Sequence, residues 1–308
     1  MWKSRHDKLF YYSLLPLAST IVLVVIILAL ILIHYSLPSL ERYGVRILVE
    51  HRWLPREDKP GSSVYGLLIP LTGTLVTSIT SIVLSLPLVL SLVILVEEIL
   101  PTKISSIFSS IVDVMAAIPT VVYGLWGLET LSPLLRNYIY TTLYRKLGFI
   151  ELFSCKPYVG TTYLTASILL AIIVTPYMFV IIREAYRAIP STYKEAIYAL
   201  GATRYEAVKT LVSMIRPAIV AGMLLAFGRA AGETVATALV IGSSFNPPNC
   251  LLSPGYTISS LIANQFGESF LYPYMASVLY LGGLVLLGIG VLSNILGLYY
   301  LRMVKYYV

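Results

Sequence analysis

Two charged residues, Arg229 and Glu233, lie within the otherwise apolar run Pro217–Ile241. In a continuous helix, a separation of four residues places both side chains on one face. A charge that faces lipid at the bilayer centre costs about 2.5–3.5 kcal/mol, so the pair is expected to face a bundle interior or an aqueous path. A guanidinium can donate two hydrogen bonds to one oxyanion, which favours a path for an anion. The alternative is a structural ion pair that fixes helix packing.

Gly228 and Gly232 precede these charges by one position each and form a Gly-x-x-x-Gly step. Such a step predicts that another helix packs closely against this one. The glycines would make that contact, with the two charged residues beside it.

A second segment could supply hydroxyl groups to the same path. Pro119 and Gly124 predict a bend in the apolar run Ile104–Leu135, and bent helices inside a membrane line cavities. Thr120 and Tyr123 could then face a passing anion. The alternative is that Pro119 is a packing kink and that Tyr123 belongs to the core.

The polar segment 190–212 reads as two short helices joined by a sharp turn. Thr192 is followed after three residues by Glu195, and Thr203 by Glu206, so each pair predicts a capping box at a helix start. Gly201 lies between them, where a left-handed residue is expected to end the first helix.

The first of these helices, Thr192–Leu200, carries one apolar stripe. The stripe falls at Tyr193, Ala196, Ile197 and Leu200, while the opposite face carries Lys194 and Glu195. Periodicity alone allows an element that docks on a partner or a helix that rests on lipid headgroups.

The remaining sequence places these segments in a membrane. The chain has 308 residues, of which 57% are hydrophobic and 12% charged. Its apolar runs are long enough for an all-α membrane protein of about six transmembrane helices, since a helical span needs about 20 residues. The predicted spans are Leu9–Ile33, Gly61–Val96, Ile104–Leu135, Pro157–Ile182, Pro217–Ile241 and Ser269–Leu301.

The distribution of Lys and Arg places both termini and the segment 190–212 in the cytoplasm of a multi-pass protein of the cell membrane. The first apolar run reads as a retained anchor; the alternative is a cleaved signal peptide. A net charge of +7 suits an anionic inner leaflet and does not argue for nucleic acid. The only two cysteines, Cys155 and Cys250, fall in outer loops and form either a disulfide or two free thiols.

Glu195-Ala196 followed by Gly201-Ala202-Thr203 resembles the EAA loop of ABC-importer permeases. The string Phe227–Thr234 is similar to the GRA-x-GET signature of phosphate importer permeases, and Ala117–Gly127 to their IPS-x-x-YG segment. Residues 252–257 and 262–268 resemble the outer loop of the PstC type. The resemblance covers roughly residues 66–301. The chain departs from the EAA pattern at Met214, where the family usually has a proline.

This resemblance implies one MetI-like permease domain over residues 1–308. Residues 1–65 would be an anchor helix and external loop, 66–303 the permease core, and 190–212 a coupling elbow that contacts an ATPase through Glu195, Ala196, Leu200, Gly201 and Ala202. It also implies a PstA-like second permease, an ATPase dimer and an external phosphate-binding protein. Arg229 and Glu233 match the positions associated with the phosphate path.

Several functions are disfavoured by what the sequence lacks. It has no Gly-x-x-x-x-Gly-Lys-Ser/Thr, so ATP and Mg²⁺ are expected on a partner chain and no cofactor on this one. Its three histidines lie at no metal-binding spacing. The rival functions are a permease for sulfate or molybdate, a membrane-embedded enzyme that uses Arg229 and Glu233 as acid and base, and a passive channel. The outer loops 37–65 and 136–158 could contact a binding protein or be solvated caps.

Overall fold

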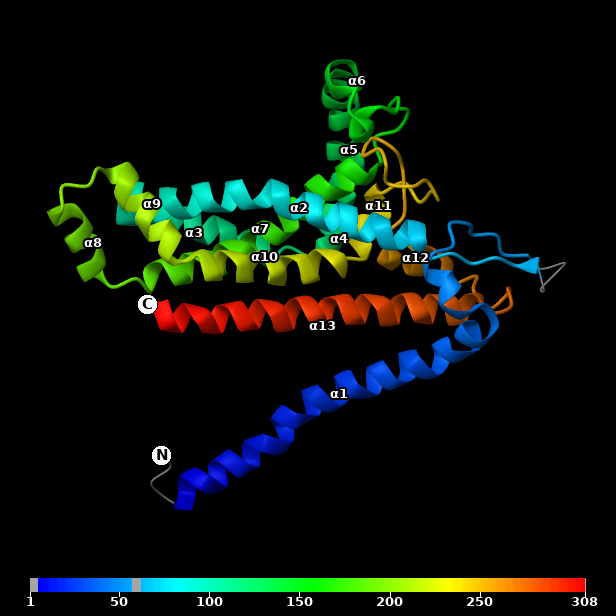
Figure 1. Cartoon of the computed structure of the whole chain (residues 1–308), viewed down its shortest axis with the longest axis horizontal. Coiled ribbons are helices and arrows are strands. Elements are labelled where there is room, and N and C mark those ends of the chain that lie inside the picture. The colour runs from blue at the N-terminus through cyan, green and yellow to red at the C-terminus, as the bar shows by residue number, and fades with distance from the viewer. Residues whose placement is uncertain (1–4, 57–61, 308) are drawn as a thin grey trace.

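The computed structural model describes residues 5–56 and 62–307, and this part of the chain is almost entirely helical (Figure 1). The α-helices are α1 Arg5–Tyr43, α2 Leu68–Ile94, α3 Thr102–Ala117, α4 Thr120–Trp126, α5 Ser132–Leu134, α6 Thr141–Leu147, α7 Tyr163–Arg187, α8 Ser191–Ala199, α9 Arg204–Met214, α10 Arg216–Ala231, α11 Val235–Val240, α12 Ile258–Gln265 and α13 Met275–Tyr307. Three π-helical segments (Leu95–Ile99, Gly127–Leu131 and Leu135–Tyr140) and two 3-10 turns (Gly44–Leu48 and Glu151–Phe153) complete it.

Four described helices are long and apolar enough to cross a membrane, and the number rises to six if each of two bent helix pairs is one span. The prediction of an all-α bundle of about six spans is therefore confirmed. The predicted bounds were less accurate. The second span was expected from Gly61, which lies outside the described residues, and α2 begins only at Leu68. Helix α1 continues ten residues beyond Ile33, into the stretch predicted as a loop.

The elbow helices and the described chain ends lie at the same end of the bundle. In Figure 1, α8 and α9, the first residues of α1 and the last residues of α13 all lie at the left end of the molecule, with α1 well separated from the elbow, whereas α12 and the long loops lie toward the opposite end. This arrangement agrees with a topology in which the elbow and both ends face one aqueous side. Residues 1–4 and 308 themselves are outside the described part.

The core of the bundle is formed by α2, α7 and α10. Val89, Val174, Met178 and Phe179 are buried in one cluster there. On α2, several buried serines and threonines lie on the same side as this contact: Thr74, Thr77, Ser78, Ser81 and Ser85. Because these side chains are small, the helix backbones can approach each other closely, as is common inside membranes.

The Gly-x-x-x-Gly step on α10 contacts α13 through one of its two glycines. A Cβ built on Gly228 would lie 2.4 Å from the hydroxyl of Ser293, so this position has no room for a side chain. A Cβ on Gly232 would meet only carbonyl oxygens of its own helix, the nearest at 3.6 Å. The close helix approach is thus found at Gly228, and Gly232 serves a different purpose.

Two of the spans are strongly bent. The axis turns by 92° between α3 and α4, at the Pro119 position where a bend was predicted. A second bend of 61° separates α9 from α10, just before Pro217. Proline removes a backbone donor and cannot continue a preceding helix without a break.

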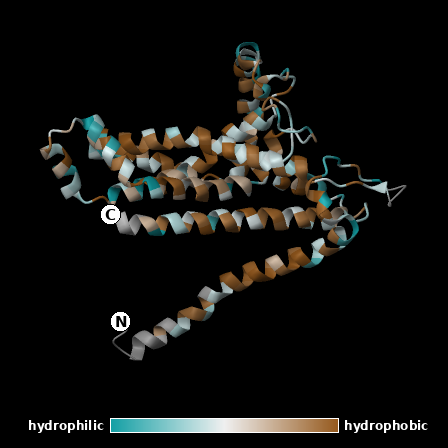
Figure 2. Cartoon of the chain, viewed as in Figure 1, coloured by the Kyte–Doolittle hydropathy of each residue, from teal (hydrophilic) through white to brown (hydrophobic). Residues whose placement is uncertain are grey.

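Figure 2 shows that the long helices consist mainly of apolar residues, whereas α9 and the loops are more polar. Helix α1 is the extreme case: Leu17 and Ile21 are 70% and 71% exposed. An apolar surface of this extent is stable in contact with lipid rather than water.

Candidate functional site

The charged segment of span five lies at a break in the helix. Helix α10 ends at Ala231, Gly232 caps it, and α11 begins at Val235, so Glu233 is in neither helix. The prediction that Arg229 and Glu233 share one face of a continuous helix is therefore wrong. No ion pair joins these two side chains among the described residues.

Hydroxyl groups compensate for the break. Thr237 and Ser259 both donate hydrogen bonds to the backbone carbonyl of Glu233, at 2.5 and 2.8 Å. The Glu233 carboxylate accepts from the backbone N–H of Ala236 at 3.4 Å, which places a negative charge at the start of α11. The helix can stop here because Gly232 adds conformational freedom and because the two hydroxyl donors and the Glu233 carboxylate give the backbone groups at the break hydrogen-bond partners in place of the helical ones.

Arg229 is half-buried and contacts an aromatic ring on α7. Its guanidinium carbon lies 3.8 Å from the centroid of the Tyr177 ring, within the range of a cation–π interaction. Its Nε atom is buried and has no hydrogen-bond partner among the described residues. Buried donors are normally satisfied, so Arg229 has donor capacity that an anion could use.

Tyr123 and Thr120 lie next to the other bend. The Tyr123 hydroxyl donates to the carbonyl of Met115 at 2.9 Å and thereby satisfies a backbone acceptor in the last turn of α3. Thr120 is the first residue of α4 and is half-buried. The structure thus engages the hydroxyl of Tyr123 with the backbone, and contact of either residue with an anion stays a prediction.

The outer halves of the two broken spans contact each other. A Cβ on Gly124 of α4 would lie 3.0 Å from the Cα of Ala236 and 2.7 Å from a methyl group of Leu239, both on α11. Gly124 is therefore needed for close packing rather than for bending. This contact connects the segment of Thr120 with the segment that follows Glu233.

The elbow has the predicted turn but only one of its two capping boxes. Gly201 has a φ of +81°, the left-handed conformation expected of a helix end. Thr203 and Glu206 form the predicted capping box, and the hydrogen bonds from Thr203 lower the pKa of the Glu206 carboxyl. The box predicted at Thr192 and Glu195 is absent, because α8 begins one residue earlier, after Pro190, and Thr192 is already within the first turn.

The apolar stripe of α8 mostly faces outward. Only Ile197 packs against the core, while Tyr193 is 46% exposed and Leu200 is 89% exposed. Ala196 and Glu195 are also exposed, as is Gly201; Ala202 is half-buried. The end of the elbow therefore presents apolar groups that the described part of the chain leaves uncovered.

Lys194, expected on the helix face opposite the apolar stripe, contacts a carboxylate cluster that the sequence analysis missed. Its Nζ atom lies 2.5 Å from Glu98, which also accepts a hydrogen bond from the Tyr186 hydroxyl. The adjacent Glu97 binds Arg183 and Arg187 at 2.7 and 2.9 Å. These contacts connect α8 and the end of α7 to the π-helical end of α2. The sequence does hold a signal for these contacts: two adjacent acidic residues stand at the end of one span, and a segment rich in Arg and Lys begins at the end of another.

A disulfide joins Cys155 and Cys250, whose Cα atoms are 6.2 Å apart. The backbone N–H of Leu251 also donates to the carbonyl of Leu152. The loop before α7 is thereby fastened to the loop that follows α11. Among the described residues, no group of three His, Cys, Asp or Glu side chains could hold a metal ion.

Residues 70–305 match the family described as the inner membrane component of binding-protein-dependent transport systems. The chain belongs to this family. It is a permease component of a plasma-membrane ABC transporter that works with a binding protein and an ATPase, and it is not an enzyme. The resemblance inferred from the EAA loop and the span-five signature is confirmed.

Curated relatives agree with this membership. The probable phosphate transport system permease protein PstC of Methanocaldococcus jannaschii is 50% identical over 92% of this chain and 90% of that protein. PstC of Haemophilus influenzae is 36% identical over 80% and 79% of the two chains, and PstC of Xylella fastidiosa is 34% identical over 91% and 86%. Among solved structures, a chain of the MetNI methionine ABC transporter in an inward-facing conformation matches with a TM-score of 0.49 and 18% identity, covering 79% of this chain and 94% of that chain.

Proposed function

We propose that this chain is the PstC-type permease subunit of an ATP-driven importer of inorganic phosphate. The observation that carries the proposal is the 50% identity to a PstC protein over 92% of the chain. The residues of the span-five signature and of the elbow lie within the aligned family region 70–305.

Arg229 is the residue we assign to the anion. Three features support this role: its Nε lacks a partner, its guanidinium rests on Tyr177 and it bonds to no carboxylate within the described chain. Glu233, which could have neutralised it, is engaged at the start of α11 instead. A guanidinium held in this way could donate a charge-assisted hydrogen bond to phosphate and release it as the path opens to the other side.

We assign the elbow to the ATPase. Leu200 and the exposed side of α8 would insert into a groove of that subunit, and nucleotide-driven closure would push α8. The pair Lys194–Glu98 would pass this movement to α2, because it is the direct side-chain link between α8 and the end of that span. The expected result is alternating access to the site around Arg229.

The complex would also contain a PstA-like second permease, two copies of the ATPase and an external phosphate-binding protein. The loops 37–65 and 136–158, the first of them only partly described, lie at or near the end of the bundle opposite the elbow and are the surfaces that we assign to the binding protein. The disulfide between Cys155 and Cys250 would hold one of these surfaces in shape.

Phosphate uptake into vesicles that contain the assembled complex tests the proposal. Arg229→Lys keeps the charge but loses the fork of donors, so uptake is expected to fall about 10- to 100-fold, the value of one charge-assisted hydrogen bond. Glu233→Gln should reduce uptake less, since the amide oxygen can still accept from α11. Arg302→Lys, at an exposed position on α13 outside the assigned contact surfaces, is the control.

Unchanged uptake in Arg229→Lys, with the complex intact, would restrict that residue to packing. Competition experiments distinguish the nearest rival function. Uptake of labelled phosphate that is displaced equally well by sulfate or molybdate would contradict phosphate as the substrate.

A further inference from the structure

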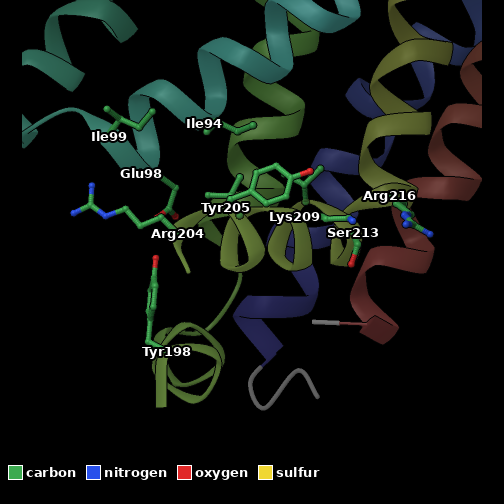
Figure 3. A pocket seen from close by; sticks show the side chains of 11 residues that line it. Ile94, Glu98, Ile99, Tyr198, Arg204, Tyr205, Lys209, Ser213 and Arg216 are labelled. Carbon is green, nitrogen blue, oxygen red and sulfur yellow. The ribbon is translucent and has the colours of Figure 1, made fainter. Parts of the chain in front are cut away.

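A cavity of about 700 Å³ opens between the elbow and the end of α2 (Figure 3). It lies where two candidate spans, those of α2 and α10, reach the elbow side of the bundle. Its walls come from α2 and its π-helical end, from α8 and α9, and from the start of α10. Neither the anion site nor the docking surface of α8 accounts for it.

The mouth of this cavity is positively charged. Arg204, Lys209 and Arg216 line it and are exposed. No carboxylate of the described residues lies within ion-pairing distance of these three cations. The acid in the wall, Glu98, is already bound to Lys194. The cavity therefore favours an anionic group with several acceptor oxygens.

Apart from this charged rim, the cavity is apolar. Ile94 and Ile99 line one wall, and Val208 and Val212 line the other. A free inorganic anion gains nothing from such walls, whereas the chain of an amphiphile is stabilised by them.

The apolar surface continues into the bilayer along the same two helices. A second groove of about 270 Å³ lies between α2 and α10, lined by Ile79, Val83, Met223 and Phe227 among others. Ile79 and Ile94 are 15 residues apart on α2, which is about 22 Å along a helix. One leaflet of the hydrocarbon core is about 15 Å deep, so an acyl chain can follow this seam through the whole leaflet.

We propose that the seam between α2 and α10 binds an anionic phospholipid of the inner leaflet. Its phosphate lies beside Lys209 and Arg216, whose side chains are on the same side of the cavity in Figure 3, and one acyl chain follows the groove toward Phe227. Basic pockets at the cytoplasmic ends of membrane helices bind such headgroups. Because Lys209 belongs to α9, the lipid would hold the second arm of the elbow against α2.

The test uses the intact complex, purified in neutral detergent and exposed either to phosphatidylglycerol or to phosphatidylcholine. Native mass spectrometry counts the lipids that each complex retains. The wild type is expected to retain phosphatidylglycerol in preference to phosphatidylcholine. Lys209→Gln and Arg216→Gln should each weaken retention about fivefold, the effect of one charge near a lipid surface. Lys103→Gln removes an exposed cation outside the cavity and is the matched control.

A variant of the groove tests the acyl chain separately. Phe227→Asn places an amide on the apolar path and should reduce retention while leaving the cationic mouth intact. The proposal would be overturned if the wild type and both charge variants retained the same amount of phosphatidylglycerol. It would also be overturned if Lys103→Gln lost as much retained lipid as the two charge variants. Displacement of the lipid by millimolar inorganic phosphate would show a site for the free anion instead. Co-purification of the ATPase with every variant separates these outcomes from a failure of the elbow.

Discussion

Leu200 offers the sharpest test of the coupling elbow. It is 89% exposed and caps the end of α8 through backbone hydrogen bonds alone. Truncation to alanine removes three carbon atoms that contribute almost nothing to the folded chain, so the stability of the permease should change by less than about 0.5 kcal/mol. The same three carbons would be buried if α8 enters a groove of the ATPase.

The expected loss of affinity follows from that burial. At about 0.8 kcal/mol for each buried methylene or methyl group, Leu200→Ala should weaken ATPase binding by about 2.4 kcal/mol, which is roughly 50-fold. The assay is titration of the purified ATPase onto the permease pair reconstituted in nanodiscs. Leu271→Ala is the matched control: Leu271 is 66% exposed and belongs to the segment between α12 and α13, which lies at the end of the bundle opposite the elbow, so its truncation should leave affinity unchanged.

Equal affinities for wild type and Leu200→Ala would refute the assignment of α8 as the docking helix. So would a lowered melting temperature of Leu200→Ala in the absence of the ATPase. That second result would mean that the side chain stabilises this chain and that the exposed apolar surface is no interface.

Three further predictions concern packing and transmission. Gly228→Leu should destabilise the contact between α10 and α13 by about 1–3 kcal/mol or more, whereas Gly232→Ala should be tolerated; thermal unfolding in detergent compares the two. Glu98→Gln should cost about 1–3 kcal/mol of stability, because the half-buried carboxylate binds both Lys194 and Tyr186, and should lower the phosphate taken up for each ATP hydrolysed; unchanged coupling would contradict the proposed link. Cys155→Ser opens a loop of 95 residues closed by Cys250 and should lower stability by up to about 4 kcal/mol, with the same shift on reduction of the wild type.

The helical bundle could be predicted because membrane spans follow from composition. The elbow turn could also be predicted, since Gly201 and the Thr203–Glu206 box act within a few residues of chain. The box at Thr192 failed for an equally local reason: Pro190 starts the helix earlier than the Thr–Glu spacing suggested.

The predictions that failed depend on contacts between distant parts of the chain. The apolar run of span five has no proline near its break at residues 232–234, and the hydroxyl of Ser259 helps to stabilise that break from 26 residues away. Lys194 and Glu98, which form an ion pair, are 96 residues apart in the sequence. Periodicity could not reveal it, because a charged side chain on a short helix is usually solvated.

The separateness of α1 has a consequence for how such transporters diversify. The helix joins the rest of the chain mainly through α13, where the ring of Tyr35 stacks on Tyr280 at 5.0 Å and the N–H of Ser39 bonds to Ser277. It also precedes the region 70–305 that the family shares. An additional anchor of this kind can be gained, lost or exchanged without disturbing the permease core that moves the substrate. The number of membrane-spanning helices is therefore free to vary among importers that share this core.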